Sequence, residues 1–69
     1  MRYLVELFWS EEDAGWIAVV PDLPGCNAWG ATPEEAVRAV QDAAAAWIDA
    51  CRAAGEPVPE PTARAREYA

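Results

Sequence analysis

Histidine and lysine are both absent from this chain of 69 residues, and these two absences remove most of the usual catalytic chemistry. Histidine is the commonest general base and the commonest neutral metal ligand, and lysine supplies the amine of Schiff-base catalysis. The nucleophiles that remain are one serine, two threonines and two cysteines, with no imidazole to activate them. We therefore expect no enzyme, no cofactor and no metal site, and we keep hydrolysis by the carboxylates only as a formal alternative.

Cysteine is scarce as well, and the two that occur are far apart in the sequence. Cys26 and Cys51 form no C-x-x-C motif, and no signal peptide precedes them, because polar residues interrupt the opening MRYLVELFW. We expect two reduced, buried thiols of a cytoplasmic protein rather than a disulfide. No segment approaches the ~20 apolar residues that a membrane-spanning helix needs, so no membrane association is expected.

Positive charge is also in short supply. Five arginines face twelve acidic residues, which gives a formal net charge of -7 and argues against direct binding to nucleic acid. A basic protein is the more natural partner for such a chain, although an acidic surface also serves plain solubility. A chain of this length is expected to fold as one domain, residues 1–69, with a core so small that association with another chain is expected.

Apolar residues are abundant, at 54% of the chain, and they first appear in alternating patterns. In residues 3–9, YLVELFW, and residues 16–20, WIAVV, the alternation predicts two strands with apolar residues on both faces. The intervening SEEDAG predicts a hairpin whose acidic tip is Glu11, Glu12 and Asp13. A single helix cannot cover both faces of such a sheet, so the second face is expected to meet another subunit or a ligand.

Proline and glycine punctuate the next segment. Pro21 and Pro24 lack the amide hydrogen of a strand ladder, and Pro24 with Gly25 suits the two central positions of a type II turn. The following CNAWGA predicts a short third strand, which Gly30 allows the chain to leave abruptly. The segment is therefore expected to interrupt one strand and start the next.

The clearest predicted element is a helix in residues 32–55, TPEEAVRAVQDAAAAWIDACRAAG. Thr32 is the expected N-cap, Glu35 completes a capping box, and Gly55 ends the helix. The apolar stripe of this helix, which includes Trp47, is expected to cover one face of the sheet.

The predicted fold class is α+β. A three-stranded antiparallel sheet with one long helix packed on one face, in the order β-β-β-α, is expected over residues 1–55. Residues 56–69 are expected to form a proline-rich exit and a short tail. The sequence leaves open whether this tail adds a further strand.

Three further tryptophans, Trp9, Trp16 and Trp29, are spread over the three predicted strands and cannot all lie beneath one helix. We expect them at a homodimer interface or at a surface for another protein, where aromatic residues are frequent anchors. The acidic hairpin tip can be a solvated turn, a cation site or a partner-binding site. These two groups are the candidate interaction residues of the chain.

The stretch GWIAVVPDLPGCNAWGATPEEAVRAVQDAAAAWID, with PVPEP after the helix, resembles the HicB-like antitoxin family. The recurring pattern is a strand ending in P-D-x-P-G-C, a short strand ending in G-x-T, and x-E-E-A opening an amphipathic helix. The resemblance extends from about Tyr3 to Pro61. Carried over residue by residue, the motif falls on Pro21, Asp22, Pro24, Gly25, Cys26, Gly30, Thr32, Glu35 and Ala36.

The resemblance implies the N-terminal HicB domain of a type II toxin-antitoxin system, a partial RNase H-like fold that dimerises and lacks the catalytic carboxylates of RNase H enzymes. It also implies that the chain binds and neutralises a small basic HicA-like toxin that cleaves mRNA. Among the polar motif residues, Asp22 has no obvious structural role except in an Asx turn. We therefore count it as a candidate for binding the partner, together with Glu11, Glu12 and Asp13.

One feature of many family members is missing. They carry a C-terminal helix-turn-helix or ribbon-helix-helix segment that binds operator DNA, and here only PTARAREYA follows the proline exit. Such a tail is too short for that module, so direct binding to DNA is not expected. An alternative function stays open, that of an orphan dimerising domain with a regulatory or ligand-binding role and no toxin partner.

Overall fold

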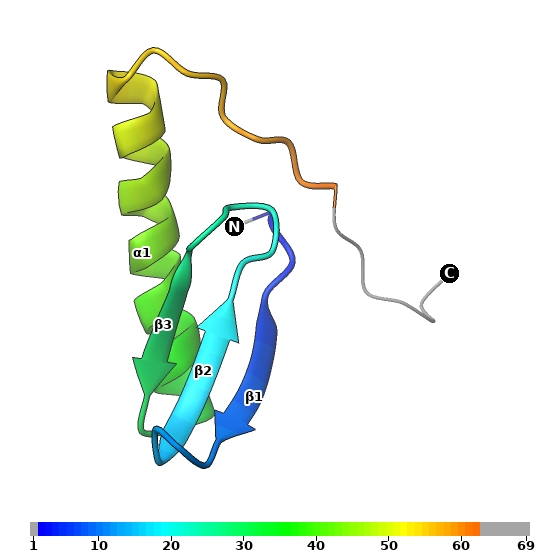
Figure 1. Ribbon diagram of the computed structural model, residues 1–69, viewed down its shortest axis with the longest axis vertical. Helices are drawn as coiled ribbons and strands as arrows, with labels where there is room; N and C mark the ends of the chain where they lie inside the picture. Colours follow the sequence, from blue (N-terminus) through cyan, green and yellow to red (C-terminus); the bar gives the residue numbers. More distant parts are fainter. Residues whose placement is uncertain (1, 63–69) are drawn as a thin grey trace.

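The computed structural model describes residues 2–62, in which three strands are followed by one helix (Figure 1). The elements are β1 (Glu6–Ser10), β2 (Gly15–Val19), β3 (Asn27–Gly30) and α1 (Pro33–Ala53). Both neighbouring strand pairs are antiparallel, and the order in the sheet is β1-β2-β3. The predicted α+β arrangement of a three-stranded antiparallel sheet with one helix is confirmed.

The register of the sheet sorts its side chains onto two faces. Ala18 on β2 is fully buried, and its partner Leu7 on β1 lies on the same face, beside α1. The next pair, Phe8 and Ile17, points to the opposite face, because successive residues of a strand alternate. The helix contacts β3 most, β2 less and β1 least. The helix therefore covers β3 and β2 and leaves most of β1 uncovered.

The first strand is shorter than its alternating pattern predicted, since it begins at Glu6 and not at Tyr3. Glu6 is paired with Val19, the last residue of β2. Beyond that pair, β2 offers β1 no further backbone partners. The Val20 amide donates to the Cys26 carbonyl in the following loop, and Pro21 has no amide hydrogen to donate. Tyr3 packs against the core instead.

Both ends of α1 are capped at the predicted residues. The Thr32 hydroxyl accepts a hydrogen bond from the Glu35 amide at 3.1 Å. The Glu35 carboxylate reaches the Ala31 amide at 3.1 Å, one residue before the position of a reciprocal capping box. At the other end Gly55 has a φ of 73°, and the next amide donates to the Cys51 carbonyl at 3.0 Å, as in a Schellman motif.

The loop between β2 and β3 supplies part of the core. Its Leu23 carbonyl accepts from the Cys26 amide at 2.9 Å, which closes a turn around Pro24 and Gly25. Gly25 has a φ of 80°, as the predicted type II turn requires. The turn folds Leu23 inward, where its side chain is fully buried.

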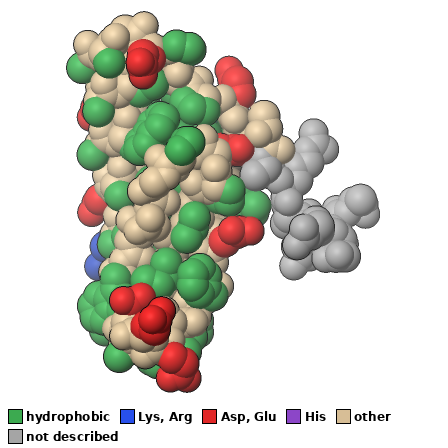
Figure 2. Space-filling view, in the orientation of Figure 1, with side chains coloured by type: hydrophobic (Ala, Val, Ile, Leu, Met, Phe, Trp, Pro, Cys, Tyr) green, Lys and Arg blue, Asp and Glu red, His purple; other side chains and the backbone are tan. Residues whose placement is uncertain are grey.

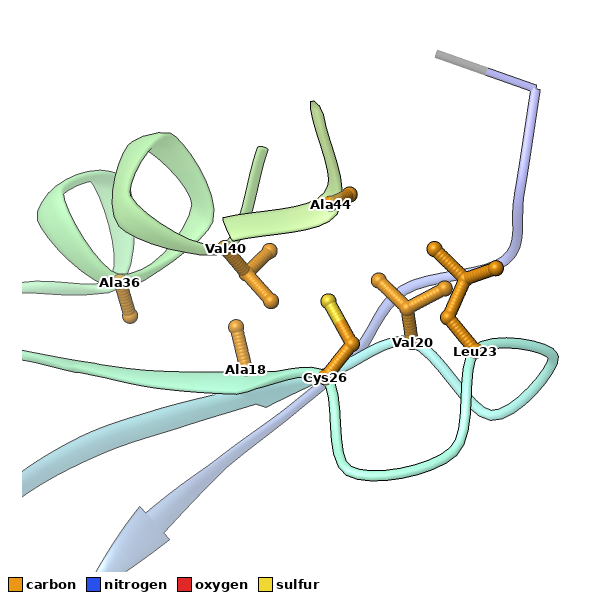
Figure 3. Packing of buried hydrophobic residues seen from close by; sticks show 7 residues of the cluster. All are labelled: Ala18, Val20, Leu23, Cys26, Ala36, Val40 and Ala44. Carbon is orange, nitrogen blue, oxygen red and sulfur yellow. The ribbon is translucent and has the colours of Figure 1, made fainter. Parts of the chain in front are cut away.

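The core between the sheet and α1 is built mostly from small side chains (Figure 3). Its buried members are Ala18, Val20, Leu23, Cys26, Ala36, Val40 and Ala44. Trp47 packs against this cluster and donates its indole N–H to the Pro24 carbonyl at 3.0 Å. Gly30 lies so close to the first turn of α1 that a Cβ there would come within 2.7 Å of the Ala36 Cα. Gly30 therefore allows a close helix approach, in addition to the chain exit that we predicted for it.

The segment after α1, drawn in orange in Figure 1, crosses to the β1 side of the molecule. The Tyr3 hydroxyl donates to the Pro59 carbonyl, and the Cys51 thiol donates to two carbonyls just beyond the helix at 3.3 and 3.4 Å. Thr62 is not part of a strand. Whether the tail forms a further strand was left open by the sequence. Its remaining residues, 63–69, lie outside the described residues.

Candidate functional site

The sheet face that α1 leaves uncovered carries a row of large apolar side chains. The register places Phe8, Ile17 and Trp29 side by side, one from each strand. Phe8 and Trp29 are each 49% exposed, and Ile17 is half-buried between them. We refer to these three residues as the open-face row. Contiguous exposed apolar residues of this kind are typical of interaction surfaces.

Trp29 joins the open-face row to the tip of the β1–β2 hairpin. Its indole N–H donates to the Asp13 carbonyl at 3.0 Å. Its ring lies over Gly15, where a Cβ would come within 2.7 Å of the Trp29 Cζ2 atom. Gly15 therefore leaves the space that the ring occupies, and the hydrogen bond holds the hairpin tip at one end of the row.

The hairpin tip is acidic, and its own contacts shape it. Glu11, Glu12 and Asp13 are all exposed. The Ser10 hydroxyl donates to the Asp13 carboxylate at 2.8 Å, and Ala14 has a left-handed φ of 49°. Figure 2 shows acidic side chains beside hydrophobic ones at the lower end of the molecule, where Figure 1 places the hairpin. An apolar row with acidic residues at one end suits a basic protein partner.

Asp22, the fourth acidic candidate, lies at the other end of the sheet, in the loop between β2 and β3. The fold therefore does not bring it together with the hairpin acids. Its carboxylate accepts the Thr62 amide at 2.9 Å and the Thr62 hydroxyl at 2.8 Å. This contact ties the exit segment to the loop, while a role of Asp22 in binding a partner stays a prediction.

The three tryptophans predicted for a dimer interface lie on two faces of the sheet. Trp9 and Trp16 are on the α1 side, with ring centroids 5.8 Å apart in an edge-to-face arrangement. Trp16 is half-buried against the core, whereas Trp9 is 47% exposed. Trp29 is on the opposite face, so one flat contact cannot cover both Trp9 and Trp29. Their place in a dimer stays a prediction.

A second apolar surface lies where α1 does not cover β1. It is an open groove of about 380 Å³, lined by Leu7, Pro33, Glu34, Val37, Arg38 and Gln41. Sequence reasoning did not single out Leu7, Phe8 or Ile17 as interaction residues. The alternating pattern was the signal that could have found them, but it does not say which side chains a helix leaves bare.

Both thiols are buried in the described part of the chain. Cys26 and Cys51 are free and buried, and burial raises the pKa of the Cys26 thiol, which lowers its thiolate population. Across residues 2–62, no three His, Cys, Asp or Glu side chains are grouped closely enough to hold a metal ion. Over the same residues, no helix combines the length and apolar character needed to cross a membrane.

The chain is similar in sequence to known proteins. A family model described as "HicB_like antitoxin of bacterial toxin-antitoxin system" matches residues 3–68. The UPF0150 protein Ta0767 of Thermoplasma acidophilum is 33% identical over 63 residues, which cover 91% of this chain and 90% of that protein. No solved structure matches the chain.

Proposed function

The chain belongs to the HicB-like antitoxin family, and from that premise we propose that it is a non-catalytic module that binds and neutralises a small basic toxin. Family membership supports a role in a toxin-antitoxin pair and therefore a toxin as partner. The toxin of this pair is, on this proposal, a HicA-like protein that cleaves mRNA. We infer a cytoplasmic location, because the free thiols of Cys26 and Cys51 fit a reducing compartment.

The observation that carries the proposal is the open-face row with the acidic hairpin tip at one end. A protein that cleaves RNA needs a basic surface for the phosphate backbone. A chain with a net charge of -7 attracts such a surface over long range. At contact, Phe8 and Trp29 supply aromatic anchors, and the acids of the hairpin tip add negative charge at one end of the row. The hydrogen bond between Trp29 and Asp13 pre-orders the two parts, which lowers the entropy lost on binding.

The direct test is co-purification with the product of a neighbouring short gene that encodes a basic protein. The cleavage of RNA by that product is then measured with and without this chain. We expect a stable complex and loss of cleavage. A basic neighbour that neither binds nor is inhibited would refute the proposal.

Charge reversal locates the surface within such a complex. Glu12→Lys at the hairpin tip should weaken the complex about tenfold, because it places a positive charge against a basic partner. Asp49→Lys changes the net charge equally on the exposed side of α1, far from the tip, and should change the affinity by less than about twofold. Equal losses for both variants would mean that only the overall charge matters, and not the hairpin tip.

A second candidate function is an orphan dimerising domain with a regulatory or ligand-binding role. The groove between β1 and α1 favours it, since Leu7 and Val37 offer an open apolar lining beside Arg38. A gene context without any basic neighbour, together with shifts of these residues in NMR titrations with small ligands, would support this candidate over the toxin-binding one.

A further inference from the structure

A pocket lies beneath the segment that follows α1, at the end of the molecule far from the hairpin tip (Figure 1). One wall is formed by Arg2 and Tyr3, a second by Ile48 and Arg52 of α1, and a third by residues 58–61. Its volume is about 340 Å³, at the lower end of the range for sites that bind small molecules, about 300 to 1,000 Å³. We refer to it as the exit pocket. Its three walls are distant in sequence and meet only in the folded chain.

The exit pocket collects positive charge in a chain that is otherwise acidic. Residues 2–62 contain three arginines, and two of them, Arg2 and Arg52, line the pocket. The dipole of α1 favours a cation in the last turn, which accounts for Arg52 by itself. It does not account for Arg2, which comes from the opposite end of the sequence. Two guanidinium groups at one cavity are suited to bind an oxyanion, because each can donate two parallel hydrogen bonds to it.

Glu60, the one acid of the lining within the described residues, occupies one of these arginines only weakly. Its carboxylate lies 3.8 Å from the Arg2 guanidinium, and the two side chains are 82% and 79% exposed. An exposed ion pair of this length contributes little to stability, so the carboxylate of a ligand can replace Glu60 at low cost. Since two arginines outnumber one acid, the lining attracts an anion more than a cation.

The remainder of the lining is apolar and held in place. Ile48 and Val58 are half-buried and face the pocket from α1 and from the exit segment. The Tyr3 hydroxyl donates to the Pro59 carbonyl, and Thr62 is tied to the loop between β2 and β3. Both ends of the third wall are therefore fixed before a ligand arrives, which lowers the entropy lost on binding.

We propose that the exit pocket binds a small organic carboxylate. Its oxygen atoms accept hydrogen bonds from Arg2 and Arg52, and its apolar body contacts Ile48 and Val58. The pocket shares no residue with the open-face row or the hairpin tip. The proposal does not rest on a toxin partner, so it holds or fails separately from the proposed function.

An NMR titration of the full chain with benzoate tests the pocket, because this probe combines a carboxylate with an apolar ring. We expect the largest amide shifts at Tyr3, Ile48 and Val58, with a dissociation constant of about 1 to 10 mM for so small a ligand. Benzamide has nearly the same shape without the charge and should bind at least about tenfold more weakly. Inorganic phosphate has the charge without the ring and should bind at least about threefold more weakly.

Three arginine variants separate the pocket from the overall charge of the chain. Arg2→Gln and Arg52→Gln should each weaken benzoate binding about tenfold. Arg38→Gln is the matched control, because it removes the same charge from another exposed arginine of α1 that is not part of the exit pocket, and it should change the affinity by less than about twofold. Thermal unfolding confirms that each variant is folded.

Glu60→Gln should have the opposite effect. It removes the carboxylate that competes for Arg2 and should tighten benzoate binding about threefold. If Arg2 only held the exit segment in place, loss of its partner would loosen the third wall and weaken binding instead.

The absence of shifts at the pocket in about 50 mM benzoate would overturn the proposal, because a site of the expected strength is then mostly occupied. Equal affinities for benzoate and benzamide would overturn the role of the arginines, and equal affinities for benzoate and phosphate the role of the apolar lining. Equal losses in Arg38→Gln and Arg52→Gln would show that only the overall charge matters.

Discussion

The part of the molecule that α1 covers buries mainly small apolar side chains, whereas the part that it leaves bare exposes large ones. In most proteins the large apolar side chains are the buried ones. Beneath the helix, the fully buried residues include Ala18 and Ala36, whereas outside it Phe8, Trp9 and Trp29 are about half exposed. Small residues let a helix lie close to a sheet, and large ones would hold it away. The comparison indicates that Phe8, Trp9 and Trp29 contribute little to the buried core, whereas Trp16 and Trp47 pack against it.

The bare half of the molecule is suited to recognition by another chain. Exposed aromatic surface is unfavourable in water, and it becomes favourable when another chain covers it. The covered half therefore determines stability, and the bare half is available for contact with another chain. Substitutions in the two halves should separate these effects.

The largest effect should come from the buried leucine. Leu23→Ala removes a fully buried side chain and should lower the free energy of unfolding by about 4 kcal/mol, which is most of the stability of so small a domain. Leu7→Ala makes the same change at a side chain that is 39% exposed and should cost less than about 1 kcal/mol. Urea denaturation at submicromolar concentration measures both values for the monomer. Similar losses would contradict the division into two halves.

The next largest effect concerns the close approach of α1 to β3. Gly30→Ala forces a Cβ against backbone atoms of the helix, which cannot move aside as a side chain can, and should cost about 3 kcal/mol. Gly25→Ala is the control, because no atom lies within 4 Å of its Cβ position and only the φ of 80° is unfavourable. It should cost about 1 kcal/mol in thermal unfolding. A tolerated Gly30→Ala would mean that the helix can shift without loss.

A smaller, local effect is expected at the hairpin. Trp29→Phe keeps an aromatic ring over Gly15 but removes the donor to the Asp13 carbonyl, at a cost of about 1 kcal/mol. Hydrogen exchange should accelerate in residues 11–14 and not in the core strands. Trp47→Phe removes the donor to Pro24 instead and should loosen the loop between β2 and β3. Unchanged hairpin exchange in Trp29→Phe would show that the bond does not hold the tip.

The smallest effect should follow removal of the contact between the loop and the exit segment. Asp22→Ala removes both acceptors of Thr62, and because Thr62 is exposed the loss should stay below about 1 kcal/mol. Faster exchange of the Thr62 amide is the expected signature, and Asp42→Ala on the exposed side of α1 is the control. If Asp22→Ala weakens toxin binding while leaving this exchange unchanged, Asp22 contacts the partner rather than the exit segment.

Local chemistry explains which features could be predicted. Thr32 and Gly55 cap α1, and Pro24 with Gly25 forms the predicted turn, because each depends on hydrogen bonds to residues a few positions away. The start of β1 was predicted wrongly, since a strand continues only where its neighbour offers partners. That information is on β2 and in the loop after it, and not in the alternating pattern of β1 itself.

The sequence alone determined the fold class, the helix with its caps, the turn, and the fact that both faces of the sheet are apolar. Only the tertiary structure decided which apolar residues stay bare, because that depends on where α1 crosses the sheet. It also decided that Trp29 reaches Asp13 and that Asp22 holds Thr62, 40 residues away. Contacts of such sequence separation arise from the packing of whole elements, which no local pattern encodes.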